Sequence, residues 1–340
     1  MMTKTTDFSL HLTSFLSRYL PGERGMSTHT ISSYRYTFIL FLNFMEQRKK
    51  TKATKLELVH ITRETIVEFL DWLQSERKCS AASGNVRLAA LHSFFRFLQY
   101  QHPDRMEEWQ KILSIKAKKH EKPAIGYLSI DGIKLLLEQP DTTVLKGRRD
   151  LALLALMYDC AVRVQEIIDM GPSSIRLDKP YTIKVVGKGN KSRIIPMMEE
   201  SVIHIKRYIV ENNLHEPHLR TSPLFFNSRR EKLTRAGVNS ILKKYVRIAY
   251  QKNPAVIIPA VSCHILRHSK AMHLLQAGVN LVYIRDFLGH ESVQTTEIYA
   301  RTDSKQKREA IEKAYVNVVN KEVPEWIGNH DLLEWLKAFK

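Results

Sequence analysis

A short basic stretch after the first third of the chain divides it into two parts. Between Ser114 and Pro123 lysine is frequent and few side chains could enter a core. Pro123 also disfavours a helix that continues through this point. Because 340 residues exceed the size of one typical hydrophobic core, we expect two domains. The predicted organisation is a domain over 1–112, a linker over 113–124, a second domain over 125–303 and a tail over 304–340.

The first domain carries apolar residues at helical spacing. Three segments each place apolar side chains on one helix face. They are residues 32–45, a segment that starts at the candidate N-cap Thr62, and residues 85–100. In the third segment these residues are Leu88, Leu91, Phe94, Phe95 and Leu98. Since the aromatic residues follow the helix period, we interpret them as core and not as a platform for stacked bases. A compact helical bundle is predicted.

The second domain combines helical patterns with one strand signal. Helices are expected over 129–139, 148–159, 201–212, 235–250 and 264–276, with Gly278 as a helix stop. Two β-rich runs, 181–186 and 192–195, flank Gly187-Lys188-Gly189-Asn190 and indicate a hairpin with glycines in its turn. The predicted fold class is mainly α with a small antiparallel β-sheet.

The charge of the chain favours a polyanionic partner. With 53 basic and 35 acidic residues, the formal net charge is +18 and the pI is about 9.7. A protein that binds nucleic acid tolerates such self-repulsion most easily, although a generally basic soluble protein is the alternative. Lys116, Lys118 and Lys119 of the linker could lie along a phosphate backbone, or the linker could be a solvated tether.

Cysteine usage and hydropathy predict a cytoplasmic, nucleoid-associated protein without a membrane partner. Cys79, Cys160 and Cys263 form no CxxC pair, which argues against a disulfide framework. The N-terminus lacks the pattern of a signal peptide. The longest apolar run, Leu151 to Tyr158, is far shorter than the roughly 20 residues of a membrane helix.

Arg163 follows a buried type of helix and stands among apolar neighbours. A guanidinium in such surroundings requires an acceptor, because burial of an unpaired charge is costly. Glu166 and a bound phosphate are both suitable acceptors, and this segment alone does not decide between them.

His264 and Arg267 are three residues apart, so they share a helix face near the N-terminus of that helix, where an anion is favoured. His264 and His268 have the i, i+4 spacing of zinc-binding helices. We set that reading aside because Arg267 lies between them and no Glu follows His264. Downstream, His290 follows Gly289 on a predicted turn, and Tyr299 lies nine positions later.

The order Arg163, Lys188, His264-x-x-Arg267, Leu288-Gly289-His290, Tyr299 resembles the tyrosine recombinase (phage integrase) family. The resemblance covers residues 125–303 as the mixed α/β catalytic domain. The first domain, linker and tail resemble the family's helical core-binding domain, linker and exchange segment. Departures include Cys160-Ala161 where the family usually has Thr-Gly, Gln165 in place of a serine, and Ser269-Lys270-Ala271-Met272 in place of Thr-Phe-Ala-Thr.

The resemblance implies a role for each residue in the breakage and rejoining of DNA. Arg163, Arg267 and His290 would stabilise charge on the phosphodiester, and Tyr299 would attack it. His264 would take the phenol proton, and Lys188 would protonate the leaving 5′-hydroxyl. Glu166 would hold a catalytic side chain without touching substrate. Lys184, Lys191 and Arg193 would grip the DNA backbone.

No cofactor and no metal are expected, because arginines would supply the electrostatic stabilisation and the spacing of a P-loop is absent. The implied partners are double-stranded DNA recombination sites and three further copies in a homotetramer on synapsed DNA. The tail could pack into a neighbouring copy or against its own domain. The biological task would be integration, excision or transposition of a mobile element; alternatives are dimer resolution of the Xer kind, a type IB topoisomerase and an inactive DNA-binding relative.

Overall fold

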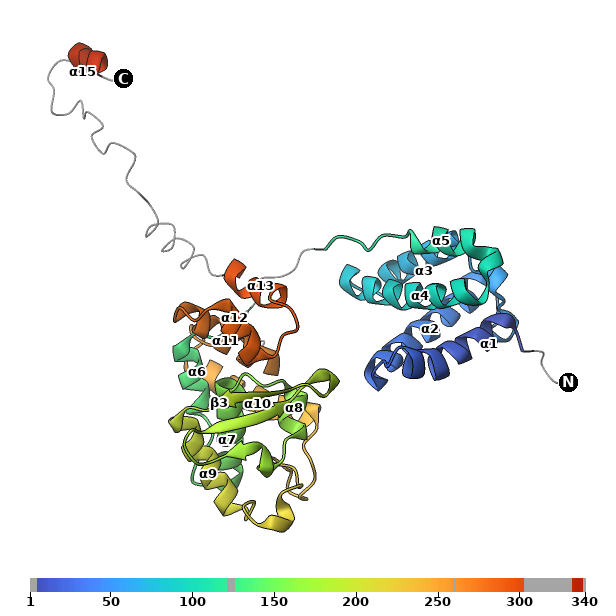
Figure 1. The fold of residues 1–340 in the computed structure, drawn as a ribbon. Helices are drawn as coiled ribbons and strands as arrows, with labels where there is room; N and C mark the ends of the chain where they lie inside the picture. Colours follow the sequence, from blue (N-terminus) through green and yellow to red (C-terminus); the bar gives the residue numbers. More distant parts are fainter. Residues whose placement is uncertain (1–4, 121–125, 260, 303–331, 339–340) are drawn as a thin grey trace. The chain divides into compact units, whose positions relative to one another are not determined.

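The chain folds as two units, Met1–Pro123 and Ala124–Lys340 (Figure 1). The computed structural model describes residues 5–120, 126–259, 261–302 and 332–338. Most of the predicted tail, 304–340, thus lies outside the described residues, which include only its short helix α15 (Leu332–Ala338). The predicted fold class is confirmed, since the described residues are mainly helical with one small antiparallel sheet.

Helices with polar caps build the first unit. They are α1 (Asp7–Ser14), α2 (Thr28–Lys49), α3 (Arg63–Ser75), α4 (Ala81–Gln101) and α5 (Met106–Leu113). A π-helical segment, Phe15–Glu23, continues α1. Ser27, Thr62 and Ser80 each accept a hydrogen bond from a backbone amide in the first turn of the following helix. The predicted cap at Thr62 is therefore confirmed.

Aromatic rings fill the core of this unit. Helix α4 packs against α2, α3 and α5. Phe15 and Phe38 each meet Phe94 edge-on, with ring centroids 5.2 Å apart in both pairs. The predicted apolar face of α4 is buried along its whole length. Its aromatic residues are core residues, as predicted, and offer no platform for bases.

The start of the predicted linker is held against the first unit. The side-chain amide of Asn85 on α4 donates to the carbonyl of Lys118 and accepts from its amide, both at 2.9 Å. The ammonium of Lys118 also lies 3.0 Å from a carboxylate oxygen of Asp71. Residues up to Lys118 thus follow the surface of the helices and do not form a free tether.

A buried helix is the centre of the second unit. Helix α7 (Leu145–Asp159) carries an uninterrupted buried stretch from Ala152 to Met157 and packs against α6, α9 and α11. The other helices that surround it or carry the site are α6 (Ile130–Leu137), α8 (Val164–Asp169), α9 (Glu199–Glu211), α10 (Arg235–Lys252), α11 (Cys263–Gln276), α12 (Leu281–Leu288) and α13 (Gln294–Thr302).

The predicted hairpin is present as part of a three-stranded sheet in the order β1-β2-β3. Its strands are β1 (Ile175–Arg176), β2 (Thr182–Val186) and β3 (Ser192–Pro196), all antiparallel. Ile183 pairs with Ile195, and both are fully buried. Gly189 in the turn has φ +71°, a left-handed conformation that glycine adopts without strain. None of the described helices combines the length and apolar character needed to span a bilayer.

Candidate active site

Arg163 and Glu166 are joined at the start of α8. The side chain of Glu166 reaches back to the backbone amide of Arg163 at 2.7 Å and to its guanidinium at 2.8 Å. The carboxylate is 5% exposed and the Arg163 side chain 37%. Arg163 therefore has an internal acceptor yet keeps part of its guanidinium towards solvent. Arg163 can therefore bind Glu166 and a phosphate at the same time, the two acceptors that the sequence left open.

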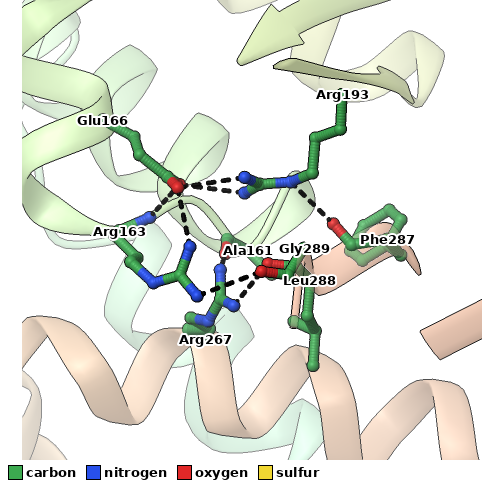
Figure 2. Close-up of polar contacts among 8 residues, drawn as sticks. All are labelled: Ala161, Arg163, Glu166, Arg193, Arg267, Phe287, Leu288 and Gly289. Carbon is green, nitrogen blue, oxygen red and sulfur yellow. Dashed lines mark hydrogen bonds and ion pairs between the residues drawn. The ribbon is translucent and has the colours of Figure 1, made fainter. Parts of the chain in front are cut away.

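Arg193 pairs with the same carboxylate. Its guanidinium donates to both oxygens of Glu166, at 3.0 and 2.9 Å, and its Nε donates to the carbonyl of Phe287 at 3.1 Å (Figure 2). Its side chain is 12% exposed. The sequence placed Arg193 among the residues that grip DNA backbone; the structure instead gives it three internal acceptors.

Glu166 is ionised in these surroundings. Burial would raise its pKa, but the hydrogen bonds from Arg193 and Arg163 outweigh that effect and hold the pKa below its usual range. The carboxylate of Glu166 thus binds two guanidinium groups, those of Arg163 and Arg193. The guanidinium of Arg267 is a third cation near this carboxylate.

Arg267 is almost completely buried on α11, at 1% exposure. It donates to the carbonyls of Ala161 at 2.6 Å and Leu288 at 2.5 Å. Its Nε has no hydrogen-bond partner among the described residues. Burial and the neighbouring charge of Arg163 lower the pKa of Arg267 to about 9, so the group is still a cation at neutral pH. A cation held in this way favours an incoming anion.

Ala161 adopts an unusual backbone conformation. Its φ is +46°, in the left-handed region that disfavours any residue with a Cβ. This is the position where the resemblance leads one to expect glycine. The conformation directs the carbonyl of Ala161 towards the guanidinium of Arg267. Ala161 therefore adopts a conformation that glycine would adopt without strain.

His264 and His268 lie one turn apart on α11 with ring centroids 4.3 Å apart, edge-on. Burial and the charges of Arg267 and Arg163 lower the pKa of His264. Burial, with His264 and Arg267, lowers the pKa of His268 to about 4. Within the described part of the chain, no three His, Cys, Asp or Glu side chains are grouped so as to hold a metal ion.

Tyr299 on α13 is 1% exposed, and its hydroxyl lies 2.8 Å from Nδ1 of His268. Burial raises the pKa of Tyr299, and the charges of Arg267 and Arg163 oppose this rise. The phenol therefore lies within the electrostatic influence of both arginines. His268 was considered from sequence only as a metal ligand, and its contact with Tyr299 was missed.

His290 follows the helix-ending Gly289, as expected for a turn, and its Nδ1 lies 3.0 Å from the hydroxyl of Thr296. Burial and the charge of Arg267 lower the pKa of His290 to about 4, so the ring is neutral at pH 7. His290 lines a cleft of about 380 Å³. The other lining residues are Arg163, Gly187, Lys191, Ser192, Arg193, Gly289, Glu291 and Thr295. Tyr299 is not among them.

The remaining predicted residues belong to the β2–β3 hairpin or to the predicted linker. Lys188 belongs to the hairpin turn between β2 and β3, but its side chain is outside the described structure. Lys184 is exposed on β2, and Lys191 is exposed beside Glu291 at 3.2 Å. In the linker, Lys116 and Lys119 are exposed, whereas Lys118 pairs with Asp71 as described. Their contacts with DNA remain predictions.

Comparison with known proteins agrees with this arrangement over both units. Residues 127–306 match the model of the phage integrase family, and residues 12–102 match that of the phage integrase N-terminal SAM-like domain. A putative integrase/recombinase, y4rC of Sinorhizobium fredii, is 35% identical over 92% of this chain and 93% of its own length. The tyrosine recombinase XerD of Listeria monocytogenes is 32% identical over 83% and 90%.

Solved structures share the fold. The XerH site-specific recombinase in a post-cleavage complex with difH substrate superposes with a TM-score of 0.67 at 21% identity, covering 85% of this chain and 81% of the other. The Tn1549 transposon integrase bound to transposon right-end DNA gives 0.67 at 14% identity, covering 91% and 99%. Given the matches over both domains, the chain belongs to the phage integrase family of tyrosine recombinases, enzymes that break and rejoin DNA.

Proposed function

We propose that this protein cuts DNA at specific sites through a 3′-phosphotyrosyl intermediate, with Tyr299 as nucleophile, and recombines them through a Holliday junction. The observation that carries the proposal is a cationic cleft with a surplus of guanidinium groups. Among the described residues, Arg163 and Arg193 share the carboxylate of Glu166 and Arg267 binds only main-chain carbonyls, while the other acidic residue that lines the cleft, Glu291, pairs with Lys191. A phosphodiester brings the negative charge that this cleft lacks.

The chemistry is assigned to the tyrosine, to the histidines of α11 that contact or neighbour it, and to the hairpin lysine. The phenolate oxygen of Tyr299 attacks phosphorus, the bond to the 5′-oxygen breaks, and the strand's 3′-phosphate becomes joined to the tyrosine. The phenol proton passes to a histidine of α11, His264 or His268, both of which burial keeps unprotonated at pH 7. Lys188 supplies a proton to the leaving 5′-oxygen. Attack by a second strand's 5′-hydroxyl reverses these steps and releases Tyr299.

Charge stabilisation is assigned to Arg163, Arg267 and His290. Arg163 and His290 line the cleft, and Arg267 lies buried behind it with a free Nε. Donors held in place by the protein need no reorganisation when charge develops on the phosphate. Glu166 is assigned to hold Arg163, because its carboxylate is 5% exposed and engaged by four N–H groups.

Exchange between two duplexes requires four reacting tyrosines, so we infer a homotetramer on paired sites. For the biological task, we infer integration, excision or transposition of a mobile element. The 35% identity to a putative integrase/recombinase over nearly the full chain supports this reading. Resolution of replicon dimers is the second candidate, supported by the 32% identity to XerD. Two otherwise identical plasmids distinguish these tasks, one with a pair of element-boundary sites and one with a pair of chromosomal dimer-resolution sites. The plasmid that recombines identifies the task.

A nicked suicide DNA substrate tests the chemistry. Wild-type protein should become covalently trapped, and Tyr299→Phe, which keeps the ring but lacks the hydroxyl, should not. Peptide mapping of the trapped complex should place the nucleotide on Tyr299. Relaxation of supercoiled DNA without exchange of paired sites would favour a topoisomerase. Specific binding with no trapping would favour an inactive DNA-binding relative.

A further inference from the structure

Three consecutive backbone carbonyls at the end of α12 each accept a hydrogen bond from a different arginine (Figure 2). The pairs are Arg193 with Phe287 at 3.1 Å, Arg267 with Leu288 at 2.5 Å and Arg163 with Gly289 at 3.3 Å. Carbonyls at a helix C-terminus lack partners within the helix and carry partial negative charge, so they favour cations. The end of α12 is therefore the shared attachment point for all three guanidinium groups.

Arg193 is the arginine that joins this attachment point to Glu166. Its Nε binds the carbonyl of Phe287, while its two terminal nitrogens bind the two oxygens of Glu166. Glu166 in turn binds Arg163 through its guanidinium and its backbone amide. Arg193 thus connects β3, α8 and α12 through one rigid, planar group.

Gly289 leaves the space that this connection needs. Its φ is +63°, and a Cβ added there would lie 2.9 Å from Nη1 and 3.0 Å from Cδ of Arg193. The arginine consequently packs directly on the backbone of the turn that leads into His290. A shift of Arg193 would move this turn together with the carbonyls that hold Arg163 and Arg267.

Because of Arg193, the carboxylate of Glu166 is shared by two cations, Arg193 and Arg163. Each Glu166 oxygen accepts from Arg193, so Arg163 makes only one side-chain bond to the carboxylate, at 2.8 Å. Without Arg193, a carboxylate that is 5% exposed would have Arg163 as its remaining side-chain cation. The full charge of Glu166 would then compete with phosphate for Arg163.

We infer that Arg193 is a positioning residue of the strand-cleavage reaction, which acts through Glu166 and the end of α12 and does not contact the DNA backbone. This inference rests on the proposed function. It assigns to Arg193 an effect on the reaction step, whereas a backbone contact would affect binding.

The dependence of DNA affinity on salt separates these roles. The logarithm of the DNA-binding constant falls linearly with the logarithm of the salt concentration. Removal of one phosphate contact makes this slope less steep by about 0.9. For full-length Arg193→Met we expect an unchanged slope and affinity within about twofold of wild type. At saturating protein, trapping on the nicked substrate should slow by about 10- to 100-fold, because small misplacement of reacting groups has effects of this size. The charge-matched Lys191→Met, on the same hairpin but 74% exposed, is compared in the same assays.

Two further variants distinguish a specific effect of Arg193 from a general loss of folding. Arg193→Lys keeps the charge but cannot form the forked pair, so it should also slow trapping with an unchanged slope. If Arg193 acts through Glu166, then Arg193→Met should add little to the defect of Glu166→Gln. A slope less steep by about 0.9, or an unchanged trapping rate at saturation in both Arg193 variants, would overturn the inference. Absence of trapping by wild type itself would instead overturn the proposed function.

Discussion

The hydroxyl of Tyr299 lies 2.8 Å from Nδ1 of His268, one helical turn beyond His264. The sequence pattern assigned the proton transfer to His264, yet in this structure the direct partner of the phenol is His268. This contact makes the role of the second histidine of α11 open to measurement.

We expect His268→Phe to slow covalent trapping on the suicide substrate by about 100-fold, the lower range for loss of a proton acceptor. Phenylalanine keeps the ring packing on Tyr299 but offers no nitrogen. The rate should be measured at saturating protein from pH 6 to 9. If the defect becomes smaller as the pH rises towards 9, where hydroxide can take the phenol proton more readily, the histidine acts on the proton. A wild-type rate at pH 7 would show that the contact has no part in cleavage.

The same histidine should make stability depend on pH. Its folded-state pKa is about 4, against 6.5 for an ordinary histidine. Between these values the unfolded chain binds a proton that the folded protein excludes, so stability falls as the pH drops through this window. We expect a loss of about 1–2 kcal/mol by pH 4, below the full shift because the half-buried ring keeps some contact with water. His268→Phe should flatten this part of the curve.

Hydrogen exchange is the suitable measurement for this change. Trp72, Trp109, Trp326 and Trp335 are the four tryptophans, and none of them belongs to residues 126–302, so a readout on α11 itself is preferred to intrinsic tryptophan fluorescence. Protection of the α11 amides, followed by mass spectrometry at pH 7 and pH 4.5, provides this readout. Equal pH dependence in wild type and His268→Phe would contradict the expectation.

A buried ion pair joins α7 to α11 behind the site. Lys270 lies 3.2 Å from a carboxylate oxygen of Asp159, and the side chains are 16% and 6% exposed. The other Asp159 oxygen accepts from the amide of Met198 at 3.0 Å. We expect Lys270→Met to destabilise the unit by about 3 kcal/mol, because a buried carboxylate loses its cation. Asp159→Asn combined with Lys270→Met should recover most of this loss, as measured by protection of α7 and α11 amides. Additive losses would contradict the pairing.

The strained position at Ala161 predicts opposite tolerance to two substitutions. Ala161→Gly should change stability by no more than about 0.5 kcal/mol, because relief of left-handed strain is offset by the lost methyl group and a more flexible unfolded chain. Ala161→Val should cost at least about 2 kcal/mol and slow trapping, since a β-branched residue resists this conformation and would turn the carbonyl from Arg267. Full activity of Ala161→Val would contradict this account.

The tail can be tested by truncation. Removal of residues 321–340 should cripple recombination of paired sites and leave binding to a single site intact, if the aromatic and leucine residues of the tail pack into a neighbouring copy and not against their own domain. Binding and assembly are measured together by gel shift with one-site and two-site DNA. Unchanged assembly on two-site DNA would remove this role.

Local patterns in the sequence were enough to predict most elements. The helix over 85–100, the Thr62 cap and the hairpin around Gly189 all depend on neighbours within a few residues. The two-residue strand β1 and the short helix α8 were not predicted, since such segments are too brief to show a period.

The candidate site could be predicted in its residue types but not in its pairings. Glu166 and Arg193 are 27 positions apart, and nothing in the strand pattern of β3 shows that its arginine turns inward to a carboxylate. His268 and Tyr299 are 31 positions apart. The i, i+4 pair of histidines was visible, but which group would approach it depends on how α13 folds back on α11.

The two carbonyls that hold Arg267 belong to the main chain, at Ala161 and Leu288. A side-chain replacement that keeps the local backbone conformation, such as Ala161→Gly, leaves the oxygen atom in place, whereas a one-residue insertion or deletion in the loop before α8 or at the end of α12 would displace it. The orientation of this guanidinium is therefore encoded in segment length more than in residue identity. Sequences that diverge widely around the cleft can keep the orientation of this guanidinium, provided that the lengths of these two turns are preserved.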